Sequence, residues 1–493
     1  MKRTLLFTLL ALLLALALVA CGGGAEEPPV EEPAVEEPTA EEPMEEVTEE
    51  PMEEVTEEPM EEATEEPMEE VTEEPVEEAP EAAEGQIYLM GADGLLSATF
   101  FDNVGEDGLG MFFTGPGQPE TGDYEAFVAS YEEAYGELPI QSFHARAYDA
   151  ANMVFAAIEQ VAEDPGDGTL VIDRGALIEA MYQMEHEGLT GTLRCNEFGD
   201  CASPVISIYR FQDVDAGVQG VLNNVLETFN FEQPDTGVGV VPEAPAEDLG
   251  QVTIASGAPI EIASLQAISG PVTNLGTDQV RGVEIAIADR GGELLGHPLQ
   301  LSMSEDDLCS AEGGTTGAQR IIANPQIVAV IGTSCSGAGV PASEALSGAG
   351  ILLISGSNTA PVLTATGYFS EEGPQRGEAW SYGYFRTAHN DEFQGRGGAQ
   401  YVIETLGVTS AATINDGDPY TQGLTSAFGG SFAEFGGEVV LATAVGAEQE
   451  DMRPVLTEVA ASGAEIVFFP IFEPAGNFIV LQAPDVGLEM IQE

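Results

Sequence analysis

Two short loops in the middle of the chain concentrate hydroxyl side chains, with Ser334 and Ser336 in the first and Ser357 and Thr359 in the second. The residues around them are small, so the loops also offer free backbone N–H groups. Hydroxyl and N–H groups donate hydrogen bonds, and such donors beside a helix N-terminus suit a carboxylate. The stretch has no obvious nucleophile–base pair. These residues therefore indicate binding of an anionic group.

Two parallel strands would bring the loops together. Residues 327–331 and 351–354 are short apolar runs, which are typical of strands buried on both faces. A helix is expected between them, over about residues 340–346. Parallel strands end in adjacent loops, where ligands of open α/β sheets usually bind. An ordinary strand–helix–strand unit with small residues at its turns is the alternative.

Several separated blocks of the sequence resemble one family. VAVIGTSCSGAG followed by LLISGSNTAPVLT is similar to the first lobe of type I periplasmic binding proteins, in the branched-chain amino acid group. Residues 263–289, 385–402 and 414–428 agree, in the order that the family has them. The resemblance covers nearly all of residues 257–493. It implies an α/β fold of two lobes, each a mostly parallel sheet flanked by helices, joined by crossover strands around a ligand cleft.

The two halves of this family stand in reversed order. Residues 86–232, with the GLTGTLRCNEFGD turn, resemble the family's second half; residues 233–250 are a linker rich in Pro, Gly and acids, and residues 251–493 resemble the first half. Circular permutation explains this order most simply, and a fragment of a tandem array is the alternative. Permutation predicts that QIYLMG, residues 86–91, pairs with the strand at 465–469 of the same chain. A helix over about 473–488 would pack between them, with no strand after it.

The second-half segment alternates predicted strands and helices. Helices are expected near residues 95–104 and over 123–135, 142–161 and 173–184, and GMFF reads as a strand.

The resemblance also implies a set of ligand contacts. Ser336 and Thr359 would bind the carboxylate of an amino acid, Asp93 its ammonium group, and the backbone of Ser357 would add an acceptor. Turn capping is the alternative role of the hydroxyls, and an acid before glycine is often only a turn former. Asp93 is shorter than the Glu that branched-chain binders commonly carry, which is a departure from the family pattern.

Four further contacts follow from the same resemblance. Tyr420 would border the ligand, and Phe143, Phe472 and Leu275 would line an apolar pocket for the side chain. Each apolar residue could equally belong to the core. Leu275 departs from relatives that have an aromatic residue there.

Five cysteines are present. Cys195 and Cys201 flank a tight NEFGD turn, where a disulfide would staple a hairpin. Cys309 and Cys335 resemble the family's first-lobe disulfide. Zinc binding is the rival, but no histidine falls at ligand spacing nearby.

The fifth cysteine, Cys21, ends a leader. Lys2 and Arg3 precede an apolar run that closes in LVAC, so residues 1–21 resemble a lipoprotein signal peptide with lipid attachment at Cys21. A plain signal peptide or a membrane anchor helix is the alternative. The implied location is the cell envelope, lipid-anchored on the outer face of the cytoplasmic membrane or in the periplasm.

Residues 22–85 repeat PMEEVTEE and are expected to be a disordered spacer, because they offer little apolar surface to bury. The formal net charge of the chain is −73, and its only lysine is Lys2. This charge makes nucleic acids and anionic membrane surfaces poor partners. High-salt adaptation and compositional habit both explain it.

Signatures of hydrolases, metalloproteases and phosphate loops are missing from the sequence, so neither an enzyme nor a cofactor or metal is expected. The four histidines are scattered and are expected to be surface or satisfied residues. The expected protein is a monomer that captures an amino acid, branched-chain or similar, or a small amide or carboxylate, for an ABC-type permease. A sensor subunit for a membrane receptor and a structural lipoprotein without ligand are the alternatives.

Overall fold

The computed structural model describes residues 86–119, 121–232, 239–246 and 248–491. The predictions for the leader 1–21, for lipidation of Cys21 and for the spacer 22–85 lie outside these residues. Among the helices that the structure does describe, none is both long and apolar enough to span a bilayer.

One sheet has the order β10-β11-β9-β12-β13-β16, and we call it and its helices lobe 1. Its strands are β9 (Ile260–Gln266), β10 (Glu293–Leu294), β11 (His297–Asp306), β12 (Ile327–Gly332), β13 (Leu352–Ser355) and β16 (Tyr384–Arg386). All neighbours are parallel except β10 and β11. Every residue of β12 is buried, as a strand covered on both faces requires.

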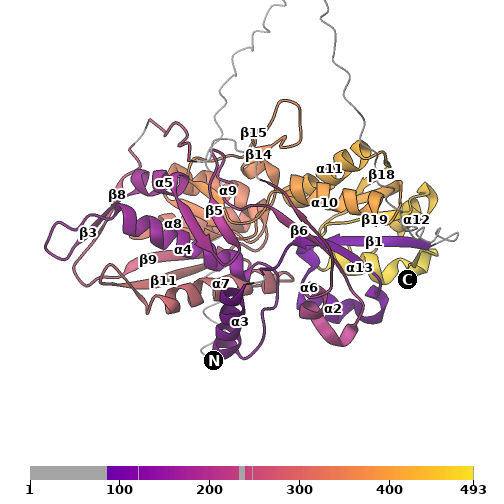
Figure 1. Ribbon diagram of the computed structural model, residues 1–493, viewed down its shortest axis with the longest axis horizontal. Coiled ribbons are helices and arrows are strands. Elements are labelled where there is room, and N and C mark those ends of the chain that lie inside the picture. Colours follow the sequence, from indigo (N-terminus) through magenta and orange to yellow (C-terminus); the bar gives the residue numbers. More distant parts are fainter. Residues whose placement is uncertain (1–85, 120, 233–238, 247, 492–493) are drawn as a thin grey trace, which may run out of the picture. The chain divides into compact units, whose positions relative to one another are not determined.

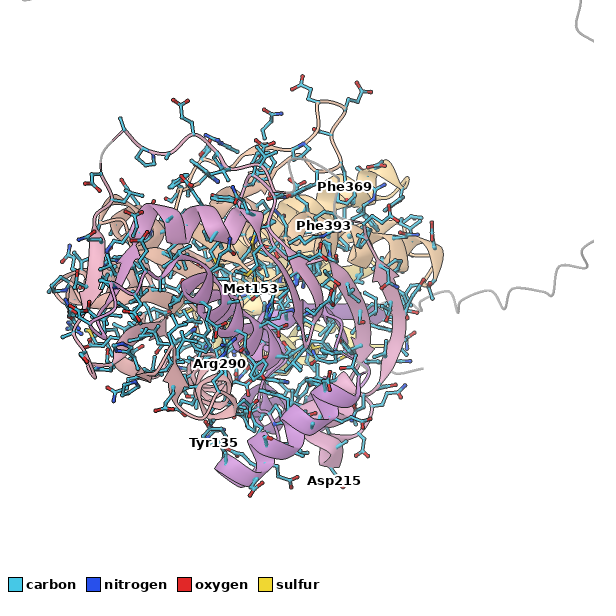
Figure 2. The ribbon with its side chains drawn as sticks, turned by 60° about the vertical axis from the view of Figure 1, so that its left-hand side comes forward. Tyr135, Met153, Asp215, Arg290, Phe369 and Phe393 are labelled. Carbon is cyan, nitrogen blue, oxygen red and sulfur yellow. A yellow bond between two sulfur atoms is a disulfide. The ribbon has the colours of Figure 1, made fainter. Side chains whose placement is uncertain are left out.

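Helices cover both faces of this sheet, and Ile262 and Leu265 of β9 belong to different apolar clusters. The helices are α3 (Gly122–Tyr135), α4 (His144–Val161), α5 (Arg174–Gln183), α7 (Thr273–Asp289), α8 (Ala311–Ile322) and α9 (Ser336–Gly348). Helix α4 packs on α7, and α8 packs on α9. Met153 of α4 is completely buried among the side chains, whereas Asp215 lies at the periphery (Figure 2).

The second sheet has the order β18-β17-β19-β1-β2-β6-β7, and we call it and its helices lobe 2. Its strands are β1 (Gln86–Ala92), β2 (Phe112–Pro116), β6 (Val205–Arg210), β7 (Val225–Asn230), β17 (Ser410–Asn415), β18 (Glu438–Ala444) and β19 (Ile466–Phe468). The strands are parallel from β18 to β2, and β6 and β7 extend the sheet antiparallel.

Its helices are α2 (Ala98–Val104), α6 (Gly217–Leu222), α10 (Asp391–Glu404), α11 (Pro419–Glu434), α12 (Arg453–Ser462) and α13 (Ala475–Gln482). Short pairs are β3 (Leu170–Asp173) with β8 (Gln251–Ile254), β4 (Glu185–Gly188) with β5 (Gly191–Arg194), and β14 (Ala365–Thr366) with β15 (Gln375–Arg376). Single 3-10 turns are η1 (Asp93–Leu95), η2 (Gly105–Gly108), η3 (Val214–Ala216), η4 (Pro361–Leu363) and η5 (Pro484–Val486).

The pairing expected between residues 86–90 and 465–469 is confirmed, because β1 lies parallel to β19 with Leu89 opposite Val467 (Figure 1). Helix α13 follows β19, as expected, but it ends at Gln482 instead of about residue 488, because residues 484–486 form the separate 3-10 turn η5. The expectation that no strand follows this helix is wrong, since β20 (Glu489–Met490) pairs with the first residues of β1. Two residues suffice for this pairing, and so short a strand leaves no periodic pattern in the sequence.

The expected helix over 340–346 is also wrong at its start, because α9 begins at Ser336. Residues 336–339, SGAG, are typical of a turn, yet they form the first turn of α9. The N–H groups of the first turn have no partner within the helix in any sequence, so turn-like small residues are compatible with this position. The helix predicted over 95–104 is shorter, since Ser97 is extended and separates η1 from α2. The helices predicted over 123–135, 142–161 and 173–184 correspond to α3, α4 and α5 within two residues.

Segments 117–143, 195–204 and 387–390 connect the two lobes. The second segment lies beside the start of the third, because Asp200 forms an isolated backbone β-bridge with Arg386. Both predicted disulfides are confirmed, Cys195–Cys201 in the second segment and Cys309–Cys335 in lobe 1. Two α/β lobes joined by crossover segments are the architecture that the sequence indicated.

Candidate ligand-binding cleft

The loops that follow β12 and β13 form the lobe 1 wall of the cleft, and their predicted hydroxyls are all buried. The Ser336 hydroxyl accepts a hydrogen bond from the Ala360 N–H at 3.2 Å. The Ser357 hydroxyl donates to the Ser334 carbonyl oxygen at 2.8 Å. The Thr359 hydroxyl has no hydrogen-bond partner among the described residues. Two of the predicted hydroxyls therefore hold the loops together, and one is left for something else.

Asp93 and Tyr420 form the facing wall in lobe 2. Asp93 opens η1 directly after β1, and Tyr420 lies in the first turn of α11. The Tyr420 hydroxyl donates to Asp93 Oδ1 at 3.1 Å and accepts from the Gly94 N–H at 3.3 Å. Burial raises the pKa of Asp93 to about 6, against the opposing effect of hydrogen bonds from Gln394 and Tyr420. The structure thus brings together two residues that are more than 300 positions apart.

Asp391 is a residue of this wall that sequence reasoning missed. Its N–H donates to the Thr359 carbonyl oxygen at 3.0 Å, which joins α10 to the lobe 1 loop. Neither of its carboxylate oxygens has a hydrogen-bond partner among the described residues, although it is completely buried. Burial, and then the charge of Asp93, raise its pKa well above the ordinary value. The nearby Thr359 hydroxyl lowers the pKa of Asp391 and so opposes this effect, although its geometry does not meet that of a hydrogen bond. In the sequence, Asp391 stands between Asn390 and Glu392 at a helix start, where an acid suggests only capping.

The three predicted apolar residues meet. Phe143 and Leu275 belong to one buried cluster with Ala388 and Cys335, and Phe472 packs against it. Phe143 directly precedes α4, Leu275 lies in the first turn of α7, and Phe472 follows β19. The ring centroids of Phe472 and Tyr420 are 5.1 Å apart, so the apolar cluster adjoins the polar wall. The disulfide Cys309–Cys335 also borders the cluster.

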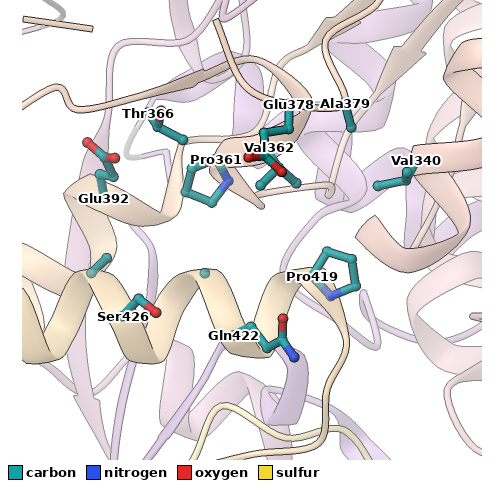
Figure 3. Close-up of a pocket in the computed structure, with 12 residues that line it drawn as sticks. Val340, Pro361, Val362, Thr366, Glu378, Ala379, Glu392, Pro419, Gln422 and Ser426 are labelled. Atoms are coloured by element: carbon teal, nitrogen blue, oxygen red, sulfur yellow. The ribbon is translucent and has the colours of Figure 1, made fainter. Parts of the chain in front are cut away.

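Two hollows flank these residues. Phe472, Val272 and Cys309 line a cavity of about 300 Å³ whose other walls come from both lobes. A wider groove of about 710 Å³ lies between η4 of lobe 1 and α11 of lobe 2, and Pro361, Pro419, Gln422 and Ser426 face it (Figure 3).

Gly423 keeps the lobes close at the bottom of that groove. A Cβ atom on Gly423 would lie 2.8 Å from the ring of Pro361 and 3.8 Å from Asp391 Oδ2. Contacts below about 3 Å force a shift of one partner, and a proline ring has little freedom to move. A side chain at position 423 would therefore press on Pro361 and come into van der Waals contact with the buried Asp391 carboxylate.

The expectation that every histidine is exposed or satisfied is wrong for His389. His389 is buried, its Nε2 is hydrogen-bonded to Gln394, and its Nδ1 has no partner among the described residues. His144 meets the expectation, since it pairs with Asp278 at 2.9 Å. The sequence did not distinguish the two histidines because both lie near polar, helix-forming segments.

Two lobes with buried polar and apolar groups meeting between them define a solute-binding architecture. A family described as periplasmic binding protein matches residues 86–217 and 259–492, which is more than half of the chain. The chain belongs to this family.

Curated relatives match over part of their length. An amino acid binding protein of Pseudomonas aeruginosa is 30% identical over 45% of this chain and 57% of its own length. A Leu/Ile/Val-binding protein of Escherichia coli is 30% identical over 47% of this chain and 59% of its own. The chain therefore spans less than two thirds of these relatives. A solute-binding protein from R. palustris in complex with benzoate aligns with a TM-score of 0.41 at 22% identity, over 47% of this chain and 61% of that one.

Proposed function

We propose that the protein captures an amino acid, branched-chain or similar, or a small amide or carboxylate, by closure of its two lobes. The observation that carries this proposal is the unpaired Asp391 carboxylate, buried beside the unpaired Thr359 hydroxyl and linked to it across the lobes. A buried ionisable group without a partner is costly, and a bound ligand would supply that partner. The names of the relatives, which bind amino acids, support the same class of ligand.

Each part of an amino acid has a counterpart in the cleft. Ser336, Thr359 and the N–H groups of their loops would bind the carboxylate. Asp93, now joined by Asp391, would bind the ammonium group, with the backbone of Ser357 as an acceptor and Tyr420 at the border. The side chain would contact the apolar residues Phe143, Leu275 and Phe472. Lobe closure over such a ligand is a hinge motion about the crossover segments.

A thermal-shift screen of the full chain tests this function. Amino acids, small amides, urea and aromatic carboxylates are added in turn, and ligand present at a hundred times its Kd stabilises the folded state by about 2.7 kcal/mol. We expect at least one of them to raise the melting temperature. A structural lipoprotein without ligand would show no shift with any of them.

We further propose that the bound ligand is handed to an ABC-type permease in the membrane. A sensor subunit shares the same binding step and differs only in its partner. Co-purification of the full chain with an ABC-type permease from membranes of its source cells distinguishes transport from sensing.

We propose that circular permutation explains the order of the halves, with residues 233–250 joining the family's original ends. This proposal is supported by the parallel pairing of β1 and β19 within one chain. Light scattering tests it, since a permuted protein is expected to be a monomer that binds ligand. Two half-proteins cut from a tandem array would each complete their fold with another chain and give oligomers.

We propose that Cys21 carries a lipid that anchors the protein in the cell envelope, with residues 22–85 as a spacer. Labelled palmitate should be incorporated into the wild-type protein and not into Cys21→Ser. Equal labelling of both proteins would contradict lipidation at Cys21.

A further inference from the structure

Two buried side chains with unpaired polar atoms lie near Asp93: Arg146 in the first turn of α4 and His389 in the crossover segment 387–390. The Thr387 hydroxyl donates to the Arg146 carbonyl oxygen at 2.8 Å, which fixes the two segments together. Phe143 and Ala388 pack in one apolar cluster, and the guanidinium carbon of Arg146 lies 6.0 Å from the centroid of the Phe143 ring. Arg146 therefore adjoins the apolar part of the cleft.

Arg146 has an unused hydrogen-bond donor. Its side chain is buried, and Nη2 donates to the Gly117 carbonyl oxygen at 3.1 Å. Nη1 has no partner among the described residues. Burial lowers the pKa of Arg146, and the charge of Asp93 is among those that oppose this effect. A buried guanidinium with an unpaired N–H group costs free energy unless an acceptor reaches it.

His389 brings an unused acceptor. Gln394 Nε2 donates to Asp93 Oδ1 at 2.6 Å and to the Thr114 carbonyl oxygen at 3.0 Å, so its Oε1 faces His389 Nε2. An amide oxygen only accepts hydrogen bonds, and Nε2 must therefore carry the proton. Burial, and then the charge of Arg146, lower the pKa of His389 to about 3, so the ring is neutral near pH 7. Nδ1 is then a bare acceptor, and it has no partner among the described residues.

We propose that Arg146 and His389 form a subsite for a carboxamide group of the ligand. The carboxamide oxygen accepts from Arg146 Nη1, and its NH₂ group donates to His389 Nδ1. A carboxylate would satisfy Arg146 but would turn a second oxygen toward the bare nitrogen, near Asp93. An aliphatic group would satisfy neither residue. This inference rests on the proposed function and narrows the ligand to amino acids with an amide side chain or to small amides.

Three amino acids of nearly equal shape test the subsite. L-asparagine, L-leucine and L-aspartate differ at the end of the side chain only, as carboxamide, isopropyl and carboxylate. Isothermal titration of the full chain with each should give asparagine an affinity at least about tenfold higher than either of the others, since sites built to hydrogen-bond a group reject analogues that lack it.

The outcomes separate the subsite from the function. If leucine or aspartate binds as tightly as asparagine, the carboxamide subsite is wrong, while amino acid binding stands. If none of the three binds, and acetamide and urea also fail, the proposed function and this inference fall together.

Arg146→Met adds a second measurement. It should lower asparagine affinity about tenfold and change leucine affinity by less than about twofold. Arg290→Met is the matched control, because Arg290 pairs with Glu159 at 2.9 Å at the far end of α7 and should leave both affinities unchanged. Equal losses for both ligands in Arg146→Met would overturn the subsite. Should this variant not fold, the three-ligand comparison on the unchanged protein still decides.

Discussion

Arg146 and Arg386 are both buried near the crossover segments, and their surroundings differ. Arg386, at the end of β16, pairs with Asp200 and donates to the carbonyl oxygens of Asn358 and Ala360 at 3.1 and 3.0 Å, and to the Thr364 hydroxyl. Arg146 has one such bond and an unpaired nitrogen. Burial disfavours both charges, but at Arg386 the combined effect of Asp200, Tyr384 and Tyr368 exceeds it and raises the pKa, whereas the pKa of Arg146 is lowered.

The difference separates a structural charge from one that lacks a structural partner. Arg386 holds the loop at 358–364, which carries Thr359, against the second crossover segment. Its hydrogen bonds close within the protein. Those of Arg146, His389, Thr359 and Asp391 do not, and all four lie around one cleft. Unpaired buried atoms also occur on Arg174, Arg210 and Tyr382, so these four groups indicate a binding site because they lie near the predicted ligand contacts Asp93 and Tyr420.

The largest expected effect is a loss of stability when the structural arginine, Arg386, is replaced. Arg386→Met leaves the buried Asp200 carboxylate without its cation and should lower the free energy of unfolding by about 3–5 kcal/mol. Urea denaturation measures it. Arg453→Met is the control, since the Arg453–Asp451 pair is exposed and its loss should leave the free energy of unfolding nearly unchanged. Equal losses in the two variants would show that burial does not distinguish the two ion pairs.

Asp93→Asn separates stability from binding. The pKa of Asp93 is raised from 3.8 to about 6, so the folded state is favoured at low pH and loses this advantage as the pH rises from about 4 to 6. The variant lacks this slope and should be more stable near pH 7 by roughly 2–3 kcal/mol. It should bind amino acids more weakly by about 2 kcal/mol, and ligands without an amine much less so. Denaturation and titration calorimetry at several pH values give both numbers, and equal losses for both ligand types would remove Asp93 from the ammonium site.

Gly423→Ala tests whether the unpaired groups depend on lobe closure. The added Cβ would lie 2.8 Å from Pro361 on the opposite lobe. This contact would strain the closed form, so we expect the free energy of binding to weaken by about 1 kcal/mol. Gly430→Ala in the same helix meets nothing within 4 Å and should leave affinity unchanged, while stability rises by roughly 0.5–1 kcal/mol. Unchanged affinity in Gly423→Ala would mean that closure does not need this contact.

The smallest expected effect is the change in stability when Arg146 is replaced. Arg146→Met should change the free energy of unfolding by less than about 1 kcal/mol, because replacing a poorly paired buried charge by an apolar side chain is often neutral. Urea denaturation of Arg146→Met and Arg386→Met, side by side, compares the two losses of stability directly. A loss as large as that of Arg386→Met would make Arg146 a structural residue.

The sequence predicted the parts of the fold that have long, regular patterns or family motifs. The pairing of β1 with β19, both disulfides and the meeting of Asp93 with Tyr420 and of Phe143 with Leu275 belong to this group. The two-residue strand β20 escaped prediction because no periodicity exists over two residues.

The missed site residues share a different cause. Asp391 has the position of a helix-capping acid, and Arg146 stands in a helix whose pattern suggested one polar face. Whether such a side chain finds a partner depends on elements from distant parts of the chain, here Thr114, Gln394 and the 387–390 segment. Hydrogen-bond satisfaction is a property of the packed structure, and no local sequence pattern records it.

The central position of β1 in the lobe 2 sheet has a consequence while the chain is being synthesised. In lobe 2, β1 is made shortly before its neighbour β2, whereas its other neighbour β19 comes from residues 466–468. The sheet of lobe 1 comes from one continuous stretch, residues 260–386. A half-made chain therefore carries an apolar strand with an open edge, of the kind that pairs with other chains, and contacts at such sequence separation form slowly. One edge of β1 therefore stays unpaired until residues 466–468 have been made.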